Sequence, residues 1–165
     1  MALYTQNIGT QMPHGFAGTY SRQPDMIVNT FPCGQDAIPF GTPVKLSAGK
    51  VVPMGAGSAA ADFIGIAAAE IKSSVNFLDQ SQGAYTKDDA VAVFQRGAIN
   101  VKCQRGTPTY NGAVYVRITE NASYPTAVVG GFETDADAGK CIAVPTLKWV
   151  GAADSNGIAE ARIIY

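Results

Sequence analysis

The sequence predicts an all-β fold, either an antiparallel barrel or a sandwich. Three observations carry this prediction. The 165 residues include 12 Ile and 14 Val against only 4 Leu, and branching at Cβ favours the pleated surface of a strand. Short runs alternate between apolar and polar residues, as half-buried strands do. The 18 Gly and 9 Pro are spread between these runs as turn residues, and the length suits one domain with its own core.

The N-terminal segment, residues 1–36, has no sustained period of a strand or of a helix. Pro13, Pro24 and Pro32 interrupt any regular element, because proline fixes φ and lacks a backbone N–H. Its large apolar side chains are too numerous for a solvated tail: Leu3, Tyr4, Phe16, Tyr20, Met26, Ile27 and Phe31. We therefore predict an extended arm that packs on a partner or on its own domain, followed by a single β domain over residues 37–165.

The first predicted hairpin follows the tripeptide Gly41-Thr42-Pro43. Val44 and Leu46 alternate with polar neighbours, residues 47–50 form a turn, and "VVPM" continues as the second strand. A related stretch begins at Gly106-Thr107-Pro108 and contains "NG", which is typical of a two-residue hairpin turn. We interpret the two copies as two hairpins of one barrel.

Residues 58–70, "SAAADFIGIAAAE", are compatible with a helix capped by Ser58 or with a strand at "FIGI". Gly65 would destabilise a helix by about 1 kcal/mol, which favours the strand. Residues 72–90 are predicted to form a long loop that could include a short helix.

Further strands are predicted over residues 91–94, 98–103, 114–118 and 158–165. In the third of these, Val114, Val116 and Ile118 alternate with Tyr115, Arg117 and Thr119.

The net charge of −1 arises from 12 basic and 13 acidic residues without a run of either sign. Nucleic-acid binding by counterion release requires a basic face, so a nucleic-acid partner is not expected. No apolar stretch approaches the 18 or so residues of a membrane span, so a membrane partner is not expected either. Charged residues make up 15% of the chain. Such depletion is typical of surfaces that become buried against protein partners, and it is equally typical of a domain that is simply rich in Ala and Gly.

The three cysteines, Cys33, Cys103 and Cys141, are odd in number and lack a Cys-x-x-Cys spacing. This argues against a disulfide framework and against a zinc site. Cys103 shares a strand face with Ile99 and Val101, so we expect it to be a buried free thiol in a protein made in a reducing cytoplasm.

No constellation of residues predicts catalysis, a cofactor or a metal. His14 is the only histidine, and it lies in the irregular arm, where a structural or solvent-facing role is expected. The close carboxylate pairs, Asp88-Asp89 and Asp135 with Asp137, lie in polar segments without the ligand spacing of a calcium loop. The sequence therefore does not predict an enzyme.

Several stretches resemble the structural cement (capsid decoration) proteins of tailed bacteriophages. The most specific runs from Gly18 through Pro24-Asp25 into "IPFG" at 38–41. "DFIGIA", "GAINVKCQRGTPTYNGAVYVRI" and the closing "GKCIAV" and "ARIIY" extend the resemblance over most of the chain. The resemblance implies a β-barrel or jelly-roll-like body that forms homodimers or homotrimers. It further implies binding to the outside of the expanded head, at junctions between major capsid protein subunits.

On this basis Phe16, Tyr20, Met26 and Phe31 are candidate contacts with capsid protein or with a sister subunit, and docking on the chain's own barrel is the alternative for each. A different class of function also remains open. A lectin-like or tail receptor-binding β module would present exposed aromatic groups and carboxylates on a loop, for which Tyr85 to Asp89 is the one candidate segment.

Overall fold

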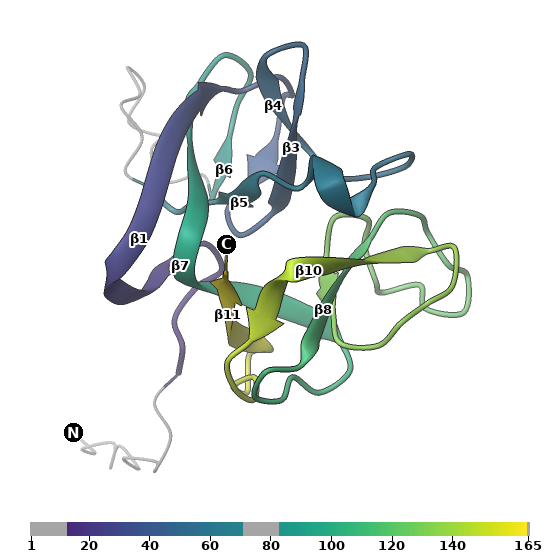
Figure 1. Cartoon of the computed structure of the whole chain (residues 1–165). Helices are drawn as coiled ribbons and strands as arrows, with labels where there is room; N and C mark the ends of the chain where they lie inside the picture. Colours follow the sequence, from purple (N-terminus) through teal and green to yellow (C-terminus); the bar gives the residue numbers. More distant parts are fainter. Residues whose placement is uncertain (1–12, 71–82, 165) are drawn as a thin grey trace, which may run out of the picture.

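A computed structural model describes residues 13–70 and 83–164, and over these residues the fold is almost entirely β (Figure 1). The only helical element in the described part is one turn of 3₁₀ helix, η1 (Ala60–Asp62). The strands are β1 (Tyr20–Pro32), β2 (Ile38–Pro39), β3 (Pro43–Ser47), β4 (Lys50–Pro53), β5 (Gly65–Ala67), β6 (Ala84–Tyr85), β7 (Ala90–Arg105), β8 (Ala113–Arg117), β9 (Phe132–Glu133), β10 (Cys141–Trp149) and β11 (Ile158–Ile163). The all-β prediction is confirmed.

Five strands close into a barrel in the order β7-β9-β8-β10-β11, with β11 returning to β7. The closing pair is antiparallel and runs from Ile158 opposite Lys102 to Ile163 opposite Gly97. Only β7 and β9 are parallel among these pairs. Closure leaves these strands without a long open edge, which is how a small barrel avoids non-specific strand pairing.

The first half of β7 extends beyond the barrel and supports a second group of strands. It pairs with β1 on one side and with β5 on the other, and β3 and β4 continue from β5. A bridge between Cys33 and Val51 joins the end of β1 to β4, so this group also curls back on itself.

Two apolar cores result, and β7 contributes to both of them. Val91 and Val93 point into the smaller core with Cys33, whereas Ala92 and Phe94 point into the larger core inside and beside the barrel. A strand that is buried on both faces needs apolar residues at consecutive positions, which explains the run "VAVF". The two runs predicted as separate strands, 91–94 and 98–103, are therefore one long strand.

The prediction that residues 1–36 contain no regular element is wrong for residues 20–32, which form β1. The alternation is hidden because the register of β1 against β7 shifts three times between Tyr20 and Val28. Within the described residues β1 pairs with β7 alone, so Pro24 and Pro32 remove no ladder hydrogen bond that a central strand would need. Residues 1–12 lie outside the described residues.

The first predicted hairpin is confirmed, because Val44 pairs with Pro53 and Ser47 with Lys50. The second is wrong as a hairpin. Asn111 and Gly112 do form a turn, closed by a 2.9 Å hydrogen bond from the Gly112 N–H to the Thr109 carbonyl. However, β8 pairs with β9 and β10 rather than with β7, since the chain leaves β7 at Arg105 and Pro108 cannot donate to a ladder.

Residues 58–70 adopt the strand alternative at β5, preceded by η1. Gly65 is required there because a Cβ atom would lie 2.4 Å from the carbonyl oxygen of Phe94 on the paired strand. The segment predicted as a loop contains β6, which pairs with β2, at its described end. Residues 71–82 of that loop lie outside the described residues.

Candidate interaction surface

Phe16 is displayed at the tip of a hydrogen-bonded turn and is 80% exposed. The backbone N–H and the hydroxyl of Thr19 both donate to the Phe16 carbonyl, at 3.2 and 2.7 Å. An aromatic side chain held in this way can bury a large apolar area against a partner without a large loss of backbone entropy on binding.

The segment that carries Phe16 is fixed to the barrel by the side chain of Asn100. Its amide Nδ2 donates to the carbonyl of His14 at 2.7 Å and lies 3.1 Å from the hydroxyl of Thr19. The backbone N–H of His14 donates in turn to the carboxylate of Asp154 at 2.9 Å. The turn at Phe16 is therefore part of the folded body.

A groove of about 800 Å³ begins beside this turn, at Ala17. Its other lining residues are Gln35, Ala37, Pro39, Phe40, Gly41, Thr42, Pro53, Met54, Gly55, Lys102, Cys103, Gln104, Thr126, Val128, Val129, Gly130, Gly131 and Phe132. Lys102 is the only charged residue in this set. Val128 and Val129 remain 63% and 39% exposed along the groove, so it presents apolar surface that the described body leaves uncovered.

The loop from Ile118 to Gly131 forms one wall of the groove and is held by side chains from outside it. The amide of Gln104 pairs with both backbone groups of Val128, at 2.9 and 3.0 Å, as a neighbouring strand would. The guanidinium of Arg105 lies 4.5 Å from the centre of the Tyr124 ring. Asn121 donates from Nδ2 to the carboxylate of Asp137 at 2.9 Å.

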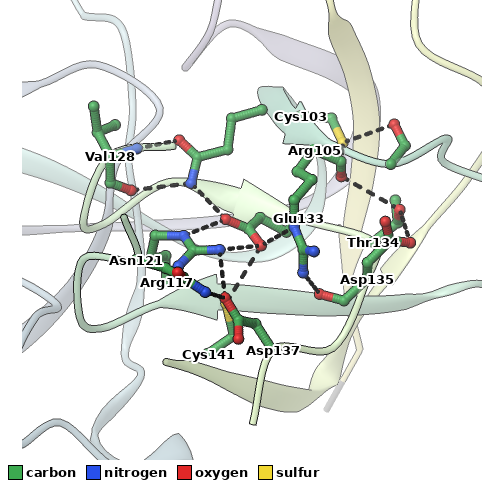
Figure 2. Close-up of polar contacts among 12 residues, drawn as sticks. Cys103, Arg105, Arg117, Asn121, Val128, Glu133, Thr134, Asp135, Asp137 and Cys141 are labelled. Atoms are coloured by element: carbon green, nitrogen blue, oxygen red, sulfur yellow. Dashed lines mark hydrogen bonds and ion pairs between the residues drawn. The ribbon is translucent and has the colours of Figure 1, made fainter. Parts of the chain in front are cut away.

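Beneath the loop lies a buried ion network centred on Glu133 (Figure 2). Its carboxylate accepts hydrogen bonds from Arg117 Nε at 2.5 Å, Arg117 Nη2 at 3.0 Å and Arg105 Nε at 2.8 Å, and another from Gln104 at 2.9 Å. The side chains of Arg117 and Glu133 are fully buried. Arg117 also donates to Asp137 at 3.1 Å, so the two cations face two carboxylates. The network fixes both ends of the loop, which lies between Arg117 and β9.

Burial alone would raise the pKa of the Glu133 carboxyl, but the hydrogen bonds from Arg117, Arg105 and Gln104 outweigh it and hold this pKa below its usual value. The hydrogen bonds of Asp137 with Asn121 and Arg117 lower the pKa of that carboxyl as well. Both groups are therefore ionised at neutral pH.

The acid dependence of stability follows from these two lowered pKa values. A carboxyl whose pKa is lower in the folded state stabilises it fully above its unfolded pKa, and this contribution is lost as the pH falls through the folded pKa. We expect the urea midpoint to be level from neutral pH down to about pH 5 and to fall below about pH 4. A midpoint that rises between about pH 5 and pH 3 would contradict this expectation.

Cys103 and Cys141 carry free thiols in the structure. Cys33 and Cys103 are buried, and burial raises the pKa of the Cys103 thiol. Cys141 lies 3.3 Å from Glu133, and burial together with this hydrogen bond raises the pKa of Cys141 to about 12. Thiols with raised pKa values are poor nucleophiles, so Cys103 and Cys141 act as packing and hydrogen-bonding groups.

Comparison with known proteins identifies the family. A family model described as "Structural cement protein (E217 gp24/Pam3 gp6)" matches residues 4–164. The chain belongs to this family of structural cement proteins. A chain of the solved structure "The capsid of Myoviridae Phage XM1" shares the fold with a TM-score of 0.71, at 19% sequence identity, over 99% of the cement protein and 98% of that chain. No curated protein matches the sequence.

The family confirms the resemblance drawn from the sequence and is a structural class of phage protein rather than a class of enzymes. Among the described residues of the cement protein, no group of three or more His, Cys, Asp or Glu side chains could hold a metal ion. The same residues include no helix with the length and hydropathy to cross a membrane.

The four predicted contact residues of the cement protein do not lie together. Tyr20 and Met26 pack partly buried against the larger core, with the Tyr20 ring 5.5 Å from that of Phe94, and Phe31 packs against the smaller core. Tyr20 also hydrogen-bonds Glu70. Phe16 is the one of the four whose side chain is largely free on the described surface.

The remaining sequence candidates take structural positions. Besides its backbone bonds, His14 places its ring Nε2 3.3 Å from the carbonyl of Ala152. Asp88 pairs with Lys50 at 2.7 Å, and the carboxylate of Asp89 accepts from Thr86. Tyr85, the aromatic residue of the possible lectin-like loop, is fully buried and donates to the Ala68 carbonyl at 2.6 Å, so it is not displayed for a glycan.

Sequence reasoning missed the groove, the Ile118–Gly131 loop and the network beneath it. Arg117 alternates with the apolar residues Val116 and Ile118, and a residue in that position of a strand normally faces solvent. The available signal was weak: the segment between β8 and β9 combines polar turn residues with the apolar pair Val128-Val129. Nothing in a linear pattern shows that the side chains of Glu133 and Arg117 form an ion pair.

Proposed function

We propose that the cement protein binds the outer surface of the phage head at junctions between major capsid protein subunits and stabilises the expanded, DNA-filled shell. The observation that carries the proposal is Phe16, which is 80% exposed on a turn that the side chains of Asn100 and Asp154 fix to the barrel beside an apolar groove. Exposed aromatic groups on rigid supports are typical binding anchors.

The architecture supports this role in a second way. A closed barrel and a curled second group of strands share β7, so a force applied to one half passes through a continuous ladder to the other. A rigid body that contacts several subunits resists their separation under the internal pressure of packaged DNA. Homodimers or homotrimers on the head would multiply modest individual affinities through effective concentration.

The test is binding of the purified cement protein to expanded heads that lack it, measured by co-sedimentation, with copies counted per major capsid protein. We expect saturation at a fixed ratio and a raised temperature of head disruption. Binding of only a few copies per head, or no change in head stability, would contradict the proposal.

Phe16→Ser should weaken head binding by about 30-fold, because loss of an interface aromatic anchor costs about 2 kcal/mol or more. The Tm of the isolated protein should not change, since the ring contributes little to its own core. Leu46→Ser is the matched control: Leu46 is another exposed apolar residue, 44% exposed on the β3–β4 hairpin. If Phe16→Ser and Leu46→Ser lowered the affinity for heads equally, Phe16 would have no specific role in the interface.

A further inference from the structure

We propose that the groove between the Ile118–Gly131 loop and the β2–β4 region binds residues 1–12 of a second copy of the chain. Neighbouring copies on the head would then be joined by arms as well as by their shared capsid contacts. This inference rests on the proposed function, because the copies become neighbours by binding to the head. Its test measures contact between copies and binding to the head separately.

The chemistry of the groove defines what it can hold. Its lining is mainly apolar or small, with Lys102 as its only charged residue and with Val128 and Val129 exposed along it. A volume of about 800 Å³ lies within the range of about 300–1,000 Å³ that encloses compact apolar ligands. A charged segment would lose hydration there without finding a partner, so the occupant should be uncharged and should carry several apolar side chains.

Residues 1–12, "MALYTQNIGTQM", meet this description. They contain no Asp, Glu, Lys or Arg, and they include Leu3, Tyr4 and Ile8. The other segment outside the described residues, 71–82, carries Lys72 and Asp79. Residues 1–12 are therefore the better match to the groove in charge.

The direction of the chain indicates that the segment in the groove comes from a neighbouring copy rather than from the same copy. Ala17 lines the groove, but three residues earlier His14 lines a different cavity together with Ala152 and Asp154, near the β10–β11 turn. Between Ala17 and His14 the described chain thus leaves its own groove. Twelve extended residues span up to about 40 Å, which exceeds the diameter of a small domain, so the segment can reach an adjacent copy.

Site-specific photocrosslinking in the full-length protein tests the proposal. Tyr4 is replaced by the photoreactive residue benzoylphenylalanine in ¹⁵N-labelled copies, which are mixed with unlabelled copies, bound to heads and irradiated. The isotope content of each crosslinked peptide pair distinguishes contact between copies from contact within one. Co-sedimentation of the same sample reports head binding independently. The probe placed at Tyr110, which is 82% exposed and does not line the groove, is the matched control.

We expect mixed-isotope crosslinks from position 4 to peptides that contain Met54 or Val128–Phe132, and none of these from position 110. Val129→Asp should abolish these crosslinks, because it places an unpaired charge in the groove. Crosslinks within single copies, or from position 4 to the major capsid protein alone, would overturn the proposal while leaving head binding intact. Failure of head binding with the between-copy crosslinks retained in solution would overturn the proposed function instead.

Discussion

Glu133→Gln should lower the Tm of the cement protein by about 6–20 °C, the largest effect we expect from a change that preserves side-chain shape. The substitution removes the negative charge that Arg117 and Arg105 share and leaves the buried guanidinium of Arg117 with Asp137 as its remaining carboxylate. Removing one partner of a buried ion pair typically costs about 3–5 kcal/mol, because the other charge stays desolvated. Calorimetric unfolding at neutral pH measures the shift.

The matched control for this change is Asp88→Asn. It removes a carboxylate whose partner, Lys50, is also exposed, so its Tm should stay close to that of the parent protein. If Glu133→Gln changed the Tm no more than this control does, the network would not be a stabilising feature. The Glu133→Gln variant should also show a weaker acid dependence, since a buried carboxyl whose pKa is lowered in the folded state would be lost.

Gly97→Ala should destabilise the fold by about 2–6 kcal/mol. Gly97 has a φ of 103°, which residues with a side chain rarely adopt, and an added Cβ would lie 2.1 Å from the carbonyl oxygen of Asp25 on β1. Either β1 must separate from β7 here or β7 must change its path between the two halves of the molecule. Urea unfolding measures the loss of free energy of unfolding.

Gly49→Ala separates the two causes of that effect. Gly49 also has a positive φ, 77°, but a Cβ atom there would meet nothing within 4 Å. Its cost should therefore be conformational only, about 1–2 kcal/mol. Equal losses in the two variants would show that the close approach of β1 to Gly97 contributes nothing to stability.

The network and the groove are related through the loop that separates them. Arg117 and Glu133 stand at the two ends of the loop, and Gln104 links Glu133 to the backbone of Val128 at the groove. A loop held in one conformation before binding loses less entropy when a partner docks on it. The buried charges thus position the exposed apolar residues, which the low charge content of the sequence alone could not indicate.

Among the sequence predictions, those that depend on local pattern were the most successful. Apolar–polar alternation predicted β3 and β4 with the turn between them, and it also predicted β8 and β11. It succeeds because the period of two follows directly from the pleat of a strand. Where the pattern was broken, prediction failed: the register shifts in β1 removed its period, and Pro145 interrupts β10. The placement of Phe16 as an exposed side chain, apart from Tyr20, Met26 and Phe31, required the structure.

The sequence by itself determined that this chain is a β protein with a core, and its motifs led to the cement family. Tertiary structure alone decided what covers each strand face. Arg117 alternates with apolar residues as a solvent-facing residue would, yet it is buried because Glu133, 16 residues later in the chain, lies against it. Periodicity specifies which side chains share a face, whereas the burial of that face depends on segments brought there by closure of the barrel.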